Sequence, residues 1–569
     1  MYQLKGIKPQ IYPKRGSNST SKPFPEIKNI TGHYNENTVN ILGLPTGSLV
    51  NNKNCEYGIN SKYVYAKTRR GSSVVVDTTT GSLGMGIARK NNDTYVFWID
   101  STGKLKYIVD GTTTVVNTGS TFATSVDTDF FFYNHPSYPT LYLCNTTNGV
   151  YKVAMSTLTV SAVASSPNIA RMAFSHISGR LFGIDNAHKV YWTEIQQTTA
   201  VDVTNIEAWN TGTNFAIISP DYGDGFRAII DDGNSLFVMK DVGVWCLPNA
   251  NESTANWIFP KLKVDIGTSA PKTVKQVRYK DKNGIAFFAN DATIRFFTGY
   301  VNRNSGTTPT FMEGDTLILS DDFQSDLDTI SRSYFSKSAS SFYDGIYSLS
   351  YASNSASAVD KMVCVDFEKG SQYWFDFENY TISNFERTKD KLYAFDTRGF
   401  IVSIFETDKI FDEIPSRLSA YTDDVVDSTD STIKQVAIRW SFYFGWIKIS
   451  DYLQRLVNGY VNFTKDGNQP LYMKVNSFIK GDYIPTYDSG VTTVLNTQIS
   501  GASYWDSSFW DSGKFLSSSN IQTNARTFSN GEGNYFNFGF YSDDIYQTAR
   551  VYSVQANFKQ IRNTPNVSN

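Results

Sequence analysis

Cysteine and histidine are scarce in this sequence, and their scarcity excludes two common kinds of stabilising site. Among 569 residues there are four cysteines and four histidines. No HExxH motif or closely spaced Cys/His set occurs, so the sequence contains no zinc motif, and four cysteines are too few for a disulfide scaffold of this size. We expect Cys55, Cys144, Cys246 and Cys364 to be buried thiols.

Long apolar runs and an excess of one charge are absent as well. No run of about 18 consecutive apolar residues occurs, so no membrane-spanning helix is expected. The opening residues, MYQLKGIKPQIYPKRG, lack the apolar core of a signal peptide, and we expect no secretory signal. The 52 Lys and Arg nearly balance the 54 Asp and Glu, and the net charge of -2 gives no indication of nucleic-acid binding by the whole chain.

Aromatic residues, in contrast, are abundant, with 39 Phe, 35 Tyr and 10 Trp. Such residues fit the half-buried surface of a β-sheet. Through the middle of the chain, a short apolar strand, a turn rich in Asp, Asn or Gly, and a second apolar strand recur together, and these turn residues suit tight hairpins. The recurring pairs of strands are 95–100 and 105–109, 141–144 and 150–153, 181–184 and 190–195, 236–239 and 244–247, 285–288 and 293–297, 362–366 and 373–377, and 392–395 and 400–405.

The spacing of this repeat predicts the fold. Its units begin about 50 residues apart, which is the period of β-propeller blades. We predict an all-β protein: a β-propeller of six or seven blades with a flanking β-domain formed by the C-terminal region and the N-terminal arm. Tandem β-sandwiches are the alternative, although they predict less regular spacing. The expected parts are 1–85, an extended N-terminal arm and first strands; 86–415, the propeller; 416–433, a polar linker; and 434–569, the C-terminal β-domain.

Two local patterns carry further structural expectations. GSLGMGIARK (81–90) is rich in glycine but matches neither GxGxxG nor the P-loop, so we interpret it as a turn leading into the first blade. Leu327, Ile330 and Tyr334 recur at helical spacing and predict a helix near 324–340.

The N-terminal arm is a candidate interface. Lys5, Lys8, Lys14 and Arg15 give it a basic character within a segment rich in Asn, Ser and Thr. Such an arm is either solvated or docked on an acidic neighbour, and the residues leave both readings open.

A second candidate interface is the tryptophan pair in YWDSSFWDSG (504–513). Trp505 and Trp510 are each followed by an aspartate. Indole rings can anchor a loop on its own domain, contact a protein partner or stack on a sugar. We favour an anchor or a protein interface over a sugar site.

Signatures of catalysis are missing from the sequence. No GxSxG elbow, paired metal ligands or phosphate-binding loop occurs, so we predict no catalytic residue, cofactor or metal and a protein that is not an enzyme. A propeller glycosidase would need carboxylates and arginines together at the propeller axis, and sequence alone cannot place such groups.

Three stretches resemble a known family. RMAFSHISGRLFGIDNAHKVYWTEI (171–195), GDGFRAIIDDGNSLFVMKDVGVWCL (223–247), and FYDGIYSLSY followed by MVCVDFEKGSQYWFDF (342–377) are similar, in order, to strand patterns of the tail hub and nozzle proteins of short-tailed phages. The likeness covers about 170–440 and extends weakly into the C-terminal region. The long N-terminal arm and the C-terminal tryptophan pair depart from the pattern.

This resemblance implies a structural protein of the virion tail, assembled in the host cytoplasm. Its subunits would form a closed ring, a hexamer by family likeness, around the DNA exit channel. Its partners would be copies of itself, neighbouring tail or connector proteins, and genomic DNA that passes without specific binding. The alternatives are a tail or baseplate protein that binds glycans on the host surface and, third, a propeller glycosidase.

Overall fold

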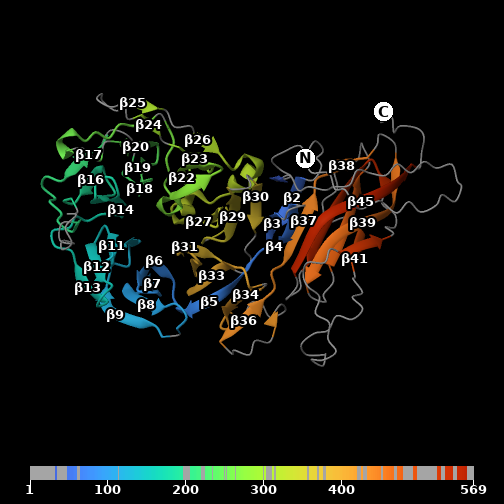
Figure 1. Ribbon diagram of the computed structural model, residues 1–569, viewed down its shortest axis with the longest axis horizontal. Helices are drawn as coiled ribbons and strands as arrows, with labels where there is room; N and C mark the ends of the chain where they lie inside the picture. Colours follow the sequence, from blue (N-terminus) through green and yellow to red (C-terminus); the bar gives the residue numbers. More distant parts are fainter. Residues whose placement is uncertain are drawn as a thin grey trace.

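Nearly all regular structure in the described part of the chain is β-strand. The computed structural model describes residues 32–560, except for 35–47, 60–63, 196–205, 220–223, 303–309, 376–379, 419–424, 427–431, 467–470, 479–490, 496–521, 527–531, 543–547 and gaps of one to three residues. The strands form two bodies that lie side by side (Figure 1). Within the described ranges, no helix is long and apolar enough to cross a membrane.

The larger body is a β-propeller of seven blades, within the predicted six or seven. Each blade is an antiparallel sheet whose first strand lies nearest the axis. Blade 1 contains β6 (Ser82–Lys90), β7 (Asp93–Asp100), β8 (Lys104–Val109) and β9 (Val116–Thr121); blade 2 contains β10 (Asp129–Tyr133), β11 (Thr140–Asn145), β12 (Gly149–Ala154) and β13 (Thr159–Ala162); blade 3 contains β14 (Arg171–Ser175), β15 (Arg180–Ile184), β16 (Lys189–Trp192) and β17 (Phe215–Ile217).

The remaining blades complete the circle. Blade 4 has three strands. The segment at Lys261 occupies its outer edge and forms an isolated β-bridge with Trp245. Blade 4 contains β18 (Ala228–Asp231), β19 (Leu236–Lys240) and β20 (Gly243–Leu247); blade 5 contains β21 (Lys275–Tyr279), β22 (Lys282–Phe288), β23 (Ile294–Phe297) and β26 (Thr316–Ile318); blade 6 contains β27 (Ala339–Tyr343), β28 (Ile346–Tyr351), β29 (Lys361–Asp366) and β30 (Ser371–Phe375); blade 7 contains β31 (Ile382–Arg387), β32 (Leu392–Asp396), β33 (Phe400–Glu406) and β5 (Gly71–Asp77). Each innermost strand contacts the next, and β31 contacts β6, which closes the ring.

Blade 7 joins the two ends of the propeller. Its outer strand, β5, comes from the N-terminal side and pairs with β33, so that Phe400 faces Asp77. An outer strand borrowed from the other end of the chain leaves no open seam in the ring. The propeller strands therefore begin at Gly71, and the expected boundary between residues 85 and 86 falls inside β6.

The glycine-rich segment 81–90 is an inner strand, and its interpretation as a turn was wrong. The glycines are needed because β6 and β10 pack closely at the axis. A side chain at Gly84 would overlap the Thr128 carbonyl oxygen, and a Cβ at Gly86 would lie 2.5 Å from Cβ of Phe130. Close backbone approach, rather than a reversal of the chain, explains the composition.

The hairpins between second and third strands follow the predicted turn chemistry. In five blades, a side-chain oxygen at the start of the turn accepts a hydrogen bond from the backbone N–H two residues later, as in an Asx turn. These side chains are Asp100, Asn145, Asp185, Asp291 and Asp396.

Apolar clusters fill the spaces between neighbouring blades. Six of them each lie within the propeller, such as the cluster of Phe97 and Leu143 between blades 1 and 2. The seventh lies between blades 6 and 7 and continues into the second body, from Cys364 and Phe385 to Trp440 and Phe538. All four cysteines are free and buried, as predicted.

The second body is a β-sandwich built from both ends of the chain, which confirms the predicted flanking domain. The N-terminal β2 pairs with β37 in one sheet, and β4 pairs with β45 in the other. One sheet contains β1 (Gly32–Tyr34), β2 (Ser48–Lys53), β37 (Trp440–Phe444), β44 (Tyr535–Ser542), β40 (Leu471–Phe478), β41 (Val491–Leu495) and β38 (Ile447–Lys448); the other contains β3 (Cys55–Ile59), β4 (Val64–Thr68), β45 (Thr548–Gln560), β39 (Gln454–Asp466), β42 (Gln522–Arg526) and β43 (Glu532–Gly533).

Two connecting segments differ from their sequence interpretation. Of the stretch expected as a polar linker, 416–433, the structure describes 416–418, 425–426 and 432–433. Here β35 (Val425–Val426) pairs with β36 (Ile433–Val436), which also pairs with β34 (Asp412–Pro415), in a small sheet. The helix expected over 324–340 is only α2 (Gln324–Leu327) with separate 3-10 turns beside it, because Phe323, Leu327 and Phe335 fill the gap between blades instead of forming one helical face.

Candidate binding site at the propeller axis

The side chains predicted from sequence as interfaces lie outside the described residues. These are Lys5, Lys8, Lys14, Arg15, Trp505 and Trp510. The structure instead draws attention to the propeller axis, where the seven inner strands bring together charged groups that are far apart in the sequence.

One end of the axis is closed by ion pairs between opposite blades. Asp127 precedes the inner strand of blade 2, whereas Lys272 precedes that of blade 5, as far around the ring as seven blades allow. The Asp127 carboxylate lies 3.3 Å from the Nζ atoms of both Lys272 and Lys337. Burial opposes ionisation of Asp127, but these lysines and Arg171 outweigh it and lower its pKa to about 2.

The middle of the axis holds a second set of charges around a small cavity. Here Arg171 lies 3.9 Å from Asp129, which also accepts a hydrogen bond from the Met172 backbone N–H. The cavity has a volume of about 160 Å³, and Lys275 and Glu386 are among the side chains that line it.

Glu386 is a strongly perturbed acid on the axis. Burial raises its pKa to about 7, and the nearby Asp129 carboxylate adds to the rise, whereas Lys275 and Arg387 act in the opposite sense. The same burial lowers the pKa of Lys275. Near neutral pH, Glu386 can therefore both accept and donate a hydrogen bond.

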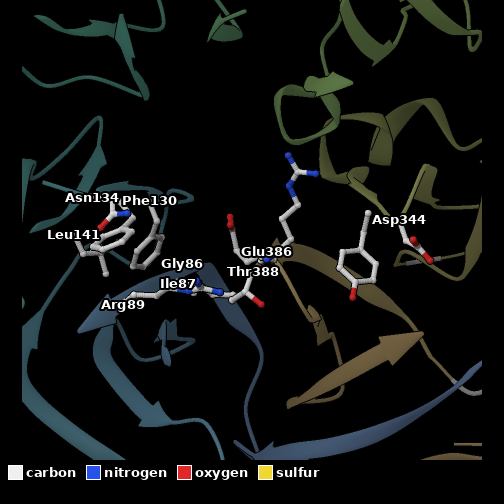
Figure 2. A pocket seen from close by; sticks show the side chains of 13 residues that line it. Gly86, Ile87, Arg89, Phe130, Asn134, Leu141, Asp344, Glu386 and Thr388 are labelled. Carbon is white, nitrogen blue, oxygen red and sulfur yellow. The ribbon is translucent and has the colours of Figure 1, made fainter. Parts of the chain in front are cut away.

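The other end of the axis opens into a cavity of about 580 Å³. Its lining comes mainly from the inner strands of blades 1, 2, 6 and 7 and from the residues that directly follow them. Figure 2 shows Phe130 and Asn134 on one side, Asp344 on the other, and Glu386 pointing into the space between them. We call this cavity the mouth. Its volume lies in the ~300–1,000 Å³ range of small-ligand sites.

Three cations line the mouth. Arg387 is exposed, and its guanidinium donates to the Phe342 carbonyl oxygen. Arg89 and Lys389 are also exposed, and neither side chain forms a hydrogen bond or ion pair with another described residue. The Asp344 carboxylate, in contrast, is engaged by Arg70 at 2.7 Å.

These contacts define what the mouth can do. Asp344 is neutralised by its arginine, so the unneutralised charge at the rim is positive. Phe130 and Phe132 are half-buried and supply apolar surface, while the exposed Asn134 supplies an amide. The site suits a small anion with an apolar face. Among the described residues, no group of His, Cys, Asp or Glu is arranged to hold a metal ion.

A different polar cluster joins the propeller to the sandwich. Arg69 lies between β4 and β5, and its guanidinium forms a two-pronged, fully buried ion pair with Asp412. Its Nε donates to Asn54 Oδ1 at 2.8 Å, and Ser72 Oγ donates to Asp412 Oδ1 at 2.9 Å. The charged groups of this cluster therefore have their ion-pair and hydrogen-bond partners within the protein.

The axial residues could not be chosen from sequence because they share no motif. They come from four different blades: Asp129 and Lys275 begin their inner strands, whereas Arg89 and Glu386 lie near the ends of theirs. The only available signal comes from comparing equivalent positions of the inner strands. A charged residue in one blade stands where neighbouring blades have an apolar residue. That signal requires the blade alignment to be known first.

Solved structures resemble the chain at low sequence identity. The computationally designed protein Ika8 is 10% identical over 63% of this chain and 98% of its own, with a TM-score of 0.33. The β-propeller domain of Myceliophteria thermophila Cps50 (Swd1) is 9% identical over 58% of this chain and 99% of its own, with a TM-score of 0.38. Chaetomium thermophilum Raptor is 10% identical over 59% of this chain and 28% of its own, with a TM-score of 0.39. These likenesses concern the fold alone. No family model and no curated protein matches the sequence.

Proposed function

We propose that this protein is a non-enzymatic structural subunit of a phage tail, which assembles into a closed ring such as a hub, nozzle or connector. The proposal begins with the sequence resemblance over 171–247 and 342–377. Those stretches supply strands of blades 3, 4 and 6, so the likeness is one of blade architecture. In this proposal the protein is assembled in the host cytoplasm and resides in the virion tail.

The observation that carries the proposal is the continuous core between propeller and sandwich. Blades 6 and 7 share one apolar cluster with the sandwich, and the buried pair of Arg69 and Asp412 lies beside it. A subunit of this construction transmits load between its two bodies without a hinge. Each body then offers a separate surface to a neighbouring copy, as head-to-tail contacts in a cyclic ring require.

The closed axis adds a constraint on where DNA would pass. Asp127 bridges opposite blades, and the axial cavity of about 160 Å³ is too small to pass a nucleic-acid strand. In the proposed ring, the DNA channel therefore lies between subunits, and the propellers act as solid blocks of its wall. The near-neutral net charge of -2 is compatible with DNA passing without tight phosphate binding.

Analytical ultracentrifugation of the purified full-length chain tests ring formation. We expect one discrete oligomer, six copies by family likeness, with no intermediate series as concentration rises, because a closed ring has no free ends. A monomer at every concentration, or an open-ended ladder of sizes, would contradict the proposal.

A further inference from the structure

The mouth of the propeller axis has the features of a ligand site that the structural function does not require. Two of its three cations, Arg89 and Lys389, form no ion pair with a described carboxylate, and the third, Arg387, donates to the Phe342 carbonyl oxygen. The contrast within the mouth is informative: Asp344 has its partner in Arg70 at 2.7 Å, while Arg89 and Lys389 have none among the described side chains. Cations gathered in a concave site raise the local concentration of an anionic ligand.

The lining also constrains the shape of that ligand. Phe130 and Phe132 lie on the blade 2 side, and Gly86 adds no side chain between them and blade 7. An aromatic face next to cations accommodates a ring with one apolar face and an acidic substituent. Asn134 offers an amide for hydroxyl groups of the ligand.

The geometry points to binding of an acidic saccharide in the mouth, with its carboxylate held by Arg89, Arg387 and Lys389 and its ring over Phe130. The cavity of about 580 Å³ admits one or two sugar rings. The inference concerns binding alone and does not rest on ring assembly. It gives the chain a surface through which an acidic glycan is recognised.

Glu386 lies where the ligand carboxylate would approach, and it makes binding depend on pH. It faces Lys275 from blade 5, Asp129 from blade 2 and Arg387 from its own strand. When Glu386 is protonated, it can donate a hydrogen bond to the ligand. When Glu386 is ionised, its negative charge repels the ligand carboxylate. Affinity for an acidic sugar should therefore fall as pH rises from about 6 to about 8.

Isothermal titration calorimetry with matched sugars tests the inference. Digalacturonate and digalactose differ in the carboxylate, so digalacturonate should bind and digalactose should bind at least about tenfold more weakly. Equal binding of both sugars, or of neither, would overturn the proposal. Inorganic phosphate as potent as digalacturonate would also overturn it, because the site would then be a general anion site.

Variants locate the binding in the mouth. Arg89→Ala combined with Lys389→Ala should weaken digalacturonate binding by about tenfold or more. Lys90→Ala is the matched control, because Lys90 is next in sequence but donates to the Ser156 carbonyl oxygen at 2.8 Å and does not line the cavity. An unchanged affinity in the double variant would overturn the assignment.

Glu386→Gln should remove the loss of affinity at higher pH, and a persistent loss would contradict its role.

Discussion

The polar cluster of Arg69 and Asp412 between propeller and sandwich, which we call the junction, and the mouth both place arginine beside acidic groups. The charges are paired at the junction and largely unpaired at the mouth. At the junction, the Arg69 and Asp412 side chains are 1% and 0% exposed and satisfy each other. At the mouth, Arg89 and Lys389 are exposed and have no such partner among the described residues. A buried charge without its partner is strongly destabilising, whereas an exposed one costs little. The junction therefore holds the fold together, and the mouth is free to bind.

The largest effect should come from breaking the junction. Asp412→Asn leaves the buried Arg69 without its counter-charge, and we expect a loss of about 3–5 kcal/mol in the free energy of unfolding. Urea unfolding at neutral pH measures it. Asp77→Asn is the matched control, because Asp77 pairs with Arg417 at 2.8 Å in a partly exposed pair and should cost no more than about 1 kcal/mol. Equal effects of the two changes would contradict the distinction.

Close packing at the axis is the next feature to test. Gly86→Ala forces a Cβ against the Phe130 side chain, and we expect a loss of about 1–3 kcal/mol in stability. Gly81→Ala, whose new Cβ would be 3.6 Å from the Thr397 carbonyl oxygen, should change stability little. Thermal unfolding of both variants gives the comparison, and a Gly86 variant as stable as wild type would show that the inner strands can separate.

Two of the axial carboxylates, Glu386 and Asp127, should respond to pH with opposite signs. The pKa of Glu386 is raised to about 7, so the folded state holds a proton that the unfolded chain has lost above about 4.3. Stability from this group is present at low pH and lost as pH rises through about 7, by on the order of 1–3 kcal/mol. Glu386→Gln should therefore flatten the pH dependence of unfolding between about pH 5 and pH 8.

Asp127 provides the internal contrast. Its pKa is lowered to about 2, so its stabilisation is present above about 3.9, the unfolded value, and is lost as pH falls toward 2. Asp127→Asn should destabilise at neutral pH and reduce the loss of stability in acid. If both carboxylates gave the same sign, the lowered pKa of Asp127 or the raised pKa of Glu386 would be wrong.

The smallest effect on stability is expected at the mouth. Arg89→Ala with Lys389→Ala removes two exposed cations that make no ion pair with the described residues, and the free energy of unfolding should change by less than about 0.5 kcal/mol. Chemical unfolding beside wild type checks this. A substantial loss of stability would mean that these cations support the fold. That result would contradict the distinction between the junction and the mouth.

Sequence reasoning found the fold because blade strands repeat locally. Apolar runs around turns such as Asp100–Lys104 and Asp396–Phe400 reflect contacts only a few residues apart. It did not assign the strand at Gly71–Asp77 to the propeller, because that strand pairs with residues more than three hundred positions away. It misread 81–90 because the need for glycine there arises from a neighbouring blade. The charged axis was missed for the same reason: Glu386 and Lys275 become neighbours only after the ring closes.

Electron microscopy of the purified full-length chain tests the central claim most directly. We expect closed rings with a central opening bounded by several subunits. Each subunit should be one rigid block, with the sandwich at a constant position against a propeller whose own axis is closed. Isolated particles without rings, or propellers and sandwiches at variable angles to each other, would contradict it.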